Sequence, residues 1–186
     1  TAEVSEIREL ADMGLLDGVT TNPTLVAKSG RAFKEVVAEI CSLVAGPVSA
    51  EVISLEAEGM VREARELLKI AKNVAIKVPM THDGLKACRA LSGEGVMVNV
   101  TAMMTLDQVR EITERLAPAT PAIISVFAGR IADTGVDPLP MMAAAVEMLK
   151  VAPASELIWA SPRELLNIFH ADSIGCQVIT VTNDIL

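Results

Sequence analysis

Short runs of β-forming residues alternate with longer amphipathic patterns along the whole chain. Runs such as AIISVF are apolar at successive positions, as expected for strands that are covered on both faces. The intervening segments carry apolar residues at three-and-four spacing, which is the repeat of one helix face. This regular alternation predicts a parallel sheet with helices between its strands. The predicted strands are residues 18–22, 48–52, 73–79, 96–101, 122–129, 156–161 and 178–183.

Seven predicted strands favour a (β/α)8 TIM barrel of the α/β class. The chain opens on a helical pattern, VSEIRELADMG, so an eighth strand upstream would close the barrel. The alternative is an open doubly wound sheet, which normally carries a glycine-rich phosphate turn, and G-x-G-x-x-G does not occur. We therefore expect residues 1–186 to form a single barrel domain that lacks its first strand.

Composition narrows the range of partners. No apolar run reaches the ~18 residues of a membrane span, although 51% of the 186 residues are hydrophobic. A net charge of -8 and 2% aromatic residues argue against a nucleic-acid surface. Cys41, Cys88 and Cys176 lie far apart in apolar patterns, so they are interpreted as reduced thiols of a cytoplasmic protein. His82 and His170 show no metal-ligand spacing, and no metal is expected.

Polar residues collect where the predicted strands end. In a barrel, the carboxyl ends of the strands carry the chemistry, so these residues are candidates for a functional site. Taken singly, a Thr, Ser or Asn at such a place is more often a turn or helix cap. The residues are Thr20, Thr21, Asn22, Glu51, Lys77, Asn99, Thr101, Ser125, Ser161, Arg163, Thr180, Thr182 and Asn183.

Lys77 stands out because it interrupts NVAIKVP, a run that otherwise suits a buried strand. Burial disfavours the charged form of an amine, and a neutral amine can attack a carbonyl to form a Schiff base. Two structural readings remain open: the ammonium reaches solvent, or it pairs with Glu51. If the amine has no partner, a Lys77→Met variant is expected to lose turnover and keep its fold.

Several motifs resemble those of the transaldolase family, especially its small-subunit branch, which includes fructose-6-phosphate aldolase. They occur in the same order over essentially the whole chain. The TTNP segment and the strand containing K-V-P are specific in combination. The motifs are DGVTTNPTL (17–25), NVAIKVP (73–79), DGLKA (83–87), VNVT (98–101), SVFAGRIADTG (125–135) and WASPR (159–163).

The resemblance implies a barrel enzyme that needs neither metal nor organic cofactor. Lys77 matches the Schiff-base lysine, which attacks the ketone of a ketose phosphate and retains a three-carbon enamine after carbon–carbon cleavage. In a transaldolase, the enamine then attacks an aldose phosphate. Glu51 and Thr101 match the pair that holds the catalytic water. Thr20, Asn22, Asn99 and Ser125 match residues that hold substrate hydroxyls, Phe127 lines the site, and Arg130, Ser161 and Arg163 match the phosphate-binding group.

Two departures from the family pattern affect this reading. The family's acid/base is an aspartate in a pattern like D-T-A, and the chain begins with Thr1 and Ala2, so an aspartate is expected directly before them. The family also continues into further helix where this chain stops at NDIL, so the barrel domain is expected to be truncated at both ends. Residues 102–121 follow VNVT with an atypical sequence, and this leaves the identity of the sugar open. The family branch commonly forms rings of ten, so a homo-oligomer, either a pentamer or a decamer, is expected.

Three functions remain after this comparison. The aldolase branch typically has Gln and Tyr where this chain has Glu51 and Phe127, so both positions favour transaldolase, a transferase of pentose phosphate metabolism. The first alternative is reversible aldol cleavage of the fructose-6-phosphate aldolase type. The second is a non-catalytic barrel that binds sugar phosphates, in which Lys77 serves only as a counter-ion.

Overall fold

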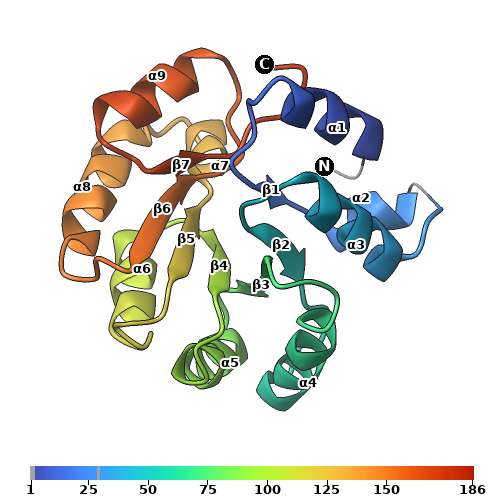
Figure 1. Cartoon of the computed structure of the whole chain (residues 1–186). Helices are drawn as coiled ribbons and strands as arrows, with labels where there is room; N and C mark the ends of the chain where they lie inside the picture. Colours follow the sequence, from blue (N-terminus) through green and yellow to red (C-terminus); the bar gives the residue numbers. More distant parts are fainter. Residues whose placement is uncertain (1–2, 29) are drawn as a thin grey trace. The chain divides into compact units, whose positions relative to one another are not determined.

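A computed structural model describes residues 3–28 and 30–186 of the chain. Helices and strands alternate throughout, which places the protein in the α/β class (Figure 1). The contacts divide the chain into two compact units, Thr1–Lys77 and Val78–Leu186. The boundary falls within the third strand, so its first four residues belong to the first unit.

The first unit contains two complete strands and the greater part of a third. β1 pairs with β2 and β2 pairs with β3, in parallel in both cases. Helix α3 contacts both α1 and α2, and α1 and α3 lie side by side in Figure 1. The elements are α1 (Val4–Asp12), β1 (Val19–Thr20), α2 (Pro23–Lys28), α3 (Phe33–Leu43), β2 (Val48–Glu51), α4 (Ala57–Leu67) and β3 (Val74–Pro79).

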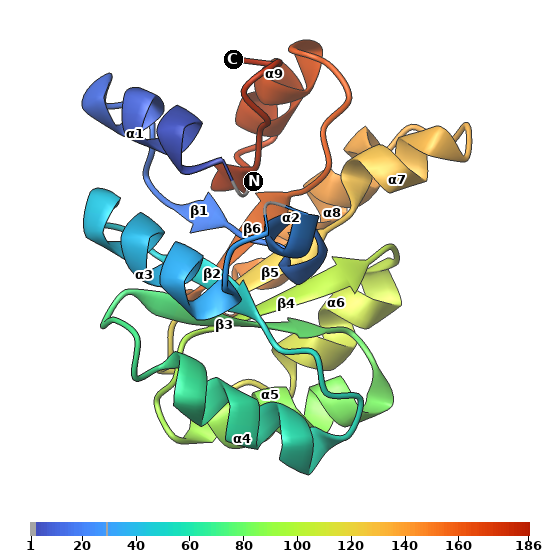
Figure 2. The same cartoon turned by 90° about the vertical axis from the view of Figure 1, so that its right-hand side faces the viewer.

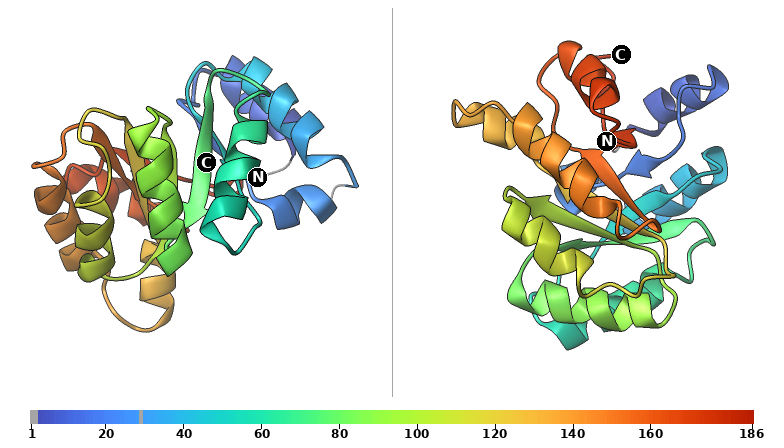
Figure 3. Two further views of the ribbon diagram at one scale, coloured as in Figure 1. Left: turned by 90° about the horizontal axis from the view of Figure 1, so that it is seen from below. Right: turned by 90° about the vertical axis from the view of Figure 1, so that its left-hand side faces the viewer.

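The second unit continues the same alternation. Strands β4, β5, β6 and β7 pair in this order and in parallel, and Figure 2 shows β4 to β6 as neighbours. Helix α8 contacts α6, α9 and β6, and Figure 3 shows these helices from two further directions. The elements are α5 (His82–Gly93), β4 (Val98–Met103), α6 (Leu106–Thr113), β5 (Ala122–Val126), α7 (Ala128–Asp133), α8 (Leu139–Leu149), β6 (Ser155–Trp159), α9 (Leu166–Ser173) and β7 (Val178–Ile179).

The strand order confirms the predicted fold class. A doubly wound sheet reverses its strand order at a switch point, whereas the strands here follow one another in chain order. Parallel strands in chain order with intervening helices are the pattern of a (β/α)8 barrel. The described residues contain seven of its strands, in agreement with the number predicted from the sequence.

Several predicted strand ends were wrong. Strand β5 ends at Val126, three residues earlier than predicted, because Phe127 caps α7 and Ala128 begins it. Strands β1 and β7 have two residues each, so the residues predicted to end them lie in loops. Strand β4 instead runs two residues further than predicted and contains a register irregularity between Val100 and Met103.

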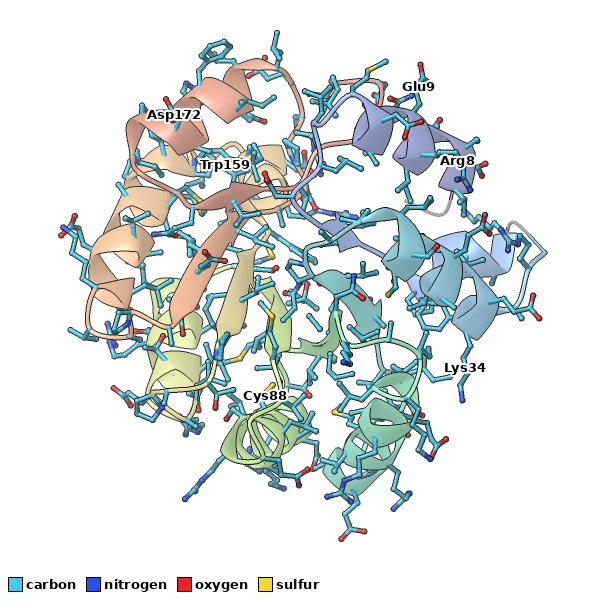
Figure 4. The ribbon with its side chains drawn as sticks, in the orientation of Figure 1. Arg8, Glu9, Lys34, Cys88, Trp159 and Asp172 are labelled. Atoms are coloured by element: carbon cyan, nitrogen blue, oxygen red, sulfur yellow. The ribbon has the colours of Figure 1, made fainter. Side chains whose placement is uncertain are left out.

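The strands are buried, as their continuous apolar runs predicted. All five residues of β5 are buried, and so are three of the four residues of β2. Trp159 at the end of β6 is fully buried, and Figure 4 labels its place. Among the residues that the structure describes, no helix has both the length and the apolar character needed to cross a membrane.

Candidate functional site

Lys77 and Glu51 form an ion pair in the first unit. They are partners in the parallel register of β2 and β3, so their side chains leave neighbouring strands at the same level. Lys77 Nζ lies 3.1 Å from Glu51 Oε2, and the two side chains are 12% and 20% exposed. The pairing that the sequence left open is therefore present. The condition of an amine without a partner is not met, because the strand register places a carboxylate opposite Lys77.

The pair combines close charges with incomplete hydrogen bonding. Glu51 Oε2 is buried. It is close enough to the Lys77 ammonium for an ion pair, but the geometry of the contact is not that of a hydrogen bond. Lys77 Nζ also donates a long hydrogen bond of 3.4 Å to the Thr21 carbonyl oxygen. Thr21 is itself held by its hydroxyl, which donates to the Ser49 carbonyl at 2.6 Å. The amine thus contacts both the last residue of β2 and the backbone directly after β1.

The loop after β2 is fastened by a second carboxylate. Glu63 accepts hydrogen bonds from the backbone N–H groups of Ile53 at 2.7 Å and Ser54 at 3.1 Å. Burial raises the pKa of the Glu63 carboxyl, but these N–H groups outweigh that effect and the pKa is lowered. The contact holds the chain that leaves Glu51. Sequence reasoning did not predict Glu63, which lies on the helix α4 that follows the loop.

Thr20 and Asn22 flank the Thr21 carbonyl that Lys77 contacts. Thr20 is the half-buried last residue of β1. The side-chain oxygen of Asn22 accepts the backbone N–H of Thr24 at 2.9 Å, which is an Asx turn at the start of α2. The turn is the common structural use of an asparagine at a strand end.

In the second unit, Asn99 and Ser125 bind each other. The Ser125 hydroxyl donates to Asn99 Oδ1 at 2.7 Å, and both residues are almost completely buried on the adjacent strands β4 and β5. Thr101, two residues after Asn99, is 2% exposed. In the part of the chain that the structure describes, its hydroxyl has no hydrogen-bond partner. Three predicted site residues therefore place buried polar atoms among apolar neighbours.

A pocket of about 440 Å³ lies within the second unit. Its lining combines apolar residues with two charged ones. Its wall includes Ala102, whose φ of 65° is rare for a residue with a side chain and marks local backbone strain. This residue begins the segment 102–121, whose sequence was expected to depart from the family pattern. The pocket is lined by Ala102, Met104, Phe127, Arg130 and Asp133.

Arg163 is engaged by a carboxylate that the sequence analysis did not predict. Its Nε donates to Asp133 Oδ1 at 2.8 Å, and its Nη2 donates to Asp133 Oδ2. These hydrogen bonds lower the pKa of the Asp133 carboxyl and raise that of the Arg163 guanidinium. Ser161, with a φ of 59°, offers its carbonyl oxygen to Arg163 Nη1 at 3.0 Å. No local sequence signal links Asp133 to Arg163, because they are 30 residues apart.

Comparison with known proteins identifies the family. The model of the family described as Transaldolase/Fructose-6-phosphate aldolase matches residues 1–186. The chain belongs to this family. A probable transaldolase of Parvibaculum lavamentivorans is 50% identical over 188 residues, which cover all of this chain and 84% of the relative. Probable transaldolases of Methanococcus maripaludis and Caldicellulosiruptor saccharolyticus are 45% and 46% identical, again over all of this chain and 85% of each relative.

Membership of the transaldolase/fructose-6-phosphate aldolase family confirms the resemblance that the motifs indicated. Thr20, Thr21, Asn22, Glu51 and Lys77 lie in the first unit, and the other predicted residues lie in the second. The two histidines, which were not expected to bind a metal, both lie on helices: His82 is at the start of α5 and His170 is in α9. Within residues 3–28 and 30–186, no group of three His, Cys, Asp or Glu side chains is arranged to hold a metal ion.

Proposed function

We propose that the protein is a transaldolase that moves a three-carbon dihydroxyacetone unit from a ketose phosphate to an aldose phosphate through a Schiff base on Lys77. The observation that carries this proposal is the pairing of Lys77 Nζ with Glu51 Oε2 at 3.1 Å, largely out of solvent, in a chain of this family. An amine with a carboxylate at this distance has a group to take its proton before it attacks a carbonyl.

In the proposed reaction, the neutral amine of Lys77 adds to the ketone carbon, and loss of water gives a protonated imine. The imine accepts the electrons of the adjacent carbon–carbon bond, a base removes the proton of the neighbouring hydroxyl, and an aldose phosphate leaves. The remaining enamine then forms a bond to the aldehyde carbon of the acceptor. Hydrolysis of the new imine returns the free lysine and releases the product ketose phosphate.

The buried polar atoms support a water-handling role for Glu51 and Thr101. Three buried side-chain polar atoms lack a hydrogen bond among the described residues, and two of them belong to these residues. Buried polar atoms of this kind are commonly satisfied by ordered water. We propose that Glu51 and Thr101 each bind the water that leaves when the imine forms and returns when it is hydrolysed.

The remaining roles follow the family resemblance. Thr20, Asn22, Asn99 and Ser125 would hold hydroxyls of the three-carbon unit, and Phe127 would line the site. Arg130, Ser161 and Arg163 would hold the phosphate, because guanidinium groups suit a phosphate dianion. Exposure supports this role for the arginines: Arg130 lines a pocket and Arg163 is partly exposed, so an anion can reach both.

Product analysis tests transfer against simple cleavage. The protein is incubated with fructose 6-phosphate, with and without an aldose phosphate acceptor, and free dihydroxyacetone is measured. A transaldolase releases little dihydroxyacetone without the acceptor and forms a new ketose phosphate with it. Substantial release of dihydroxyacetone without the acceptor would instead support the aldolase alternative. The presence of Glu51 and Phe127, where the aldolase branch typically has Gln and Tyr, disfavours that alternative.

The ion pair also suits a non-catalytic barrel, in which Lys77 and Glu51 merely balance each other's charge. Such a protein would bind a sugar phosphate without forming a covalent bond. Reduction with borohydride in the presence of substrate separates the two cases, because only an imine is converted into a stable adduct. Peptide mass spectrometry then identifies the modified lysine.

A further inference from the structure

The guanidinium of Arg163 is held by two acceptors in the second unit. Asp133 binds its Nε and Nη2 side by side, and the Ser161 carbonyl accepts from Nη1. Arginine has five N–H donors, so among the described residues these three hydrogen bonds leave two donors, one on each terminal nitrogen. The two-point contact with Asp133 fixes the plane of the guanidinium, and the Ser161 contact restrains one of its ends.

The Ser161 carbonyl is itself fixed by close packing against α7. A Cβ atom added at Gly129 would lie 1.6 Å from that oxygen and 3.3 Å from Arg163 Cζ, so only glycine allows this approach. The Gly129 N–H donates to the Ala160 carbonyl, which ties α7 to the end of β6. Asp133 is the last residue of α7. The short helix α7 therefore restrains Arg163 in two ways: it carries Asp133, and its Gly129 packs against the Ser161 carbonyl that accepts from Arg163.

Asp133 also changes the local charge. Arg130 lies one helical turn before it on α7, and its charge helps to lower the pKa of the Asp133 carboxyl. Two guanidinium groups and one carboxylate leave a single net positive charge at this place. A carboxylate beside an anion site can therefore act in two opposite ways: it can compete with the anion for arginine, or it can orient the arginine that binds the anion.

We propose that Asp133 is a positioning residue for anion recognition, which holds Arg163 so that its two remaining N–H donors are preorganised for the phosphate of the sugar substrate. This inference rests on the proposed function, which assigns phosphate binding to Arg163. We expect the orienting effect to exceed the competing one. An unrestrained arginine loses side-chain conformational entropy when it binds an anion, whereas Asp133 and Ser161 already order the side chain of Arg163.

The test compares an Asp133→Asn variant with the wild-type protein at one ionic strength. Calorimetry with inorganic phosphate is expected to show about tenfold weaker binding, because asparagine cannot accept from both nitrogens of the fork. The KM for the ketose phosphate should rise by about the same factor, while kcat stays within about twofold. Turnover of the unphosphorylated ketose should not change. An Asp133→Glu variant, which keeps the carboxylate, should recover part of the affinity.

An Asp107→Asn variant is the matched control. Asp107 is exposed and pairs with Arg110 at 2.8 Å on α6 of the same unit, so its loss removes a similar surface ion pair whose residues do not line the pocket. Its affinity for phosphate should equal that of the wild-type protein. Melting curves of all variants report on folding, and Asp133 is exposed enough for its loss to be tolerated.

If Asp133 instead competes with the phosphate for Arg163, its replacement should strengthen phosphate binding. Phosphate binding by Asp133→Asn that is as tight as in the wild-type protein, or tighter, would overturn the inference, and so would an equal rise of KM for the unphosphorylated ketose. A wild-type protein that does not bind phosphate at all would overturn it as well. Trapping of an imine on wild-type Lys77 would stand in each of these cases, so failure of the positioning role is distinguishable from failure of the proposed function.

Discussion

Lys77 and Glu51 lie opposite each other in the parallel register of β3 and β2, with 3.1 Å between the ammonium nitrogen and a carboxylate oxygen. Parallel register alone brings them together, so the contact does not depend on a loop. If Glu51 takes the proton of the amine, its removal must slow the first chemical step. The variants below test this relationship and the structure around it.

A Glu51→Gln variant should form the Schiff base about 100-fold more slowly, since general acid–base groups typically contribute factors of this order. The rate is measured by quenching with borohydride at increasing times after substrate is added. Glu39→Gln is a suitable control, because Glu39 also pairs with arginines in the first unit and is partly exposed on α3. An unchanged trapping rate in Glu51→Gln would refute the proton-acceptor role.

The ion pair also makes a prediction about stability. Lys77→Met leaves the Glu51 carboxylate without its partner in a largely buried place, so it should lower the free energy of unfolding by about 1–3 kcal/mol. The double variant Lys77→Met/Glu51→Gln removes the unpaired charge and should regain most of that loss. Urea unfolding of the four proteins measures the coupling. A double variant less stable than Lys77→Met would contradict this account.

Gly129 should be intolerant of any side chain. Its added Cβ would meet the Ser161 carbonyl at 1.6 Å, so Gly129→Ala is expected to cost about 2 kcal/mol or more and to disturb Arg163. Gly93→Ala, at the end of α5, meets nothing within 4 Å and should be neutral or slightly stabilising. Thermal melting compares the two, and equal melting temperatures would show that α7 does not approach Ser161 closely.

Acid should weaken the fold through its hydrogen-bonded carboxylates. The pKa of Asp133 is lowered by its hydrogen bonds from Arg163, and that of Glu63 by the N–H groups of Ile53 and Ser54 despite burial. Between these lowered values and the ordinary values of 3.8 and 4.5, the unfolded chain binds more protons than the folded chain. Their contribution is therefore complete above about pH 5 and is lost as the pH falls through the folded-state values.

Unfolding in urea measures this loss of stability in acid. The pH is varied from about 3, where carboxylates titrate, to about 7. A Glu63→Gln variant should be less stable than the wild-type protein at pH 7, and the difference should narrow in acid as the wild-type carboxylate becomes protonated. A constant difference at every pH would show that the Glu63 contacts do not depend on its charge.

Cys88 should resist thiol reagents. It is completely buried on the side of α5 that packs inward, and burial raises its pKa to about 12, so almost no thiolate is present at neutral pH. Figure 4 marks its place on α5. Alkylation followed by peptide mapping should find Cys88 unmodified in the folded protein and modified in denaturant. Rapid labelling without denaturant would contradict the packing of α5.

The fold was largely predictable because its signals are local and repeated. Seven apolar runs and the helical patterns between them predicted the strand count and the parallel class. Strand ends were less predictable: the apolar run after Val126 continues into α7, and hydropathy does not distinguish a buried strand end from a buried helix start.

The candidate site was predictable only in part. The apolar run around Lys77 singled out the lysine, but its partner depended on the register between β2 and β3, which the sequence left open. Asp133 gave no local signal, because its role comes from a contact with a residue on a distant loop. The orphaned hydroxyl of Thr101 is likewise visible only when all its neighbours are placed. The sequence therefore did not predict which side chains from different segments contact one another.

Borohydride trapping tests the central claim most directly. The wild-type protein is incubated with fructose 6-phosphate, reduced, digested and analysed by mass spectrometry, beside Lys77→Met and a Lys86→Met control on the exposed face of α5. The account predicts a three-carbon adduct on Lys77 in the wild-type and Lys86→Met proteins and none in Lys77→Met. No adduct on the wild-type protein, or one on another lysine, would contradict it.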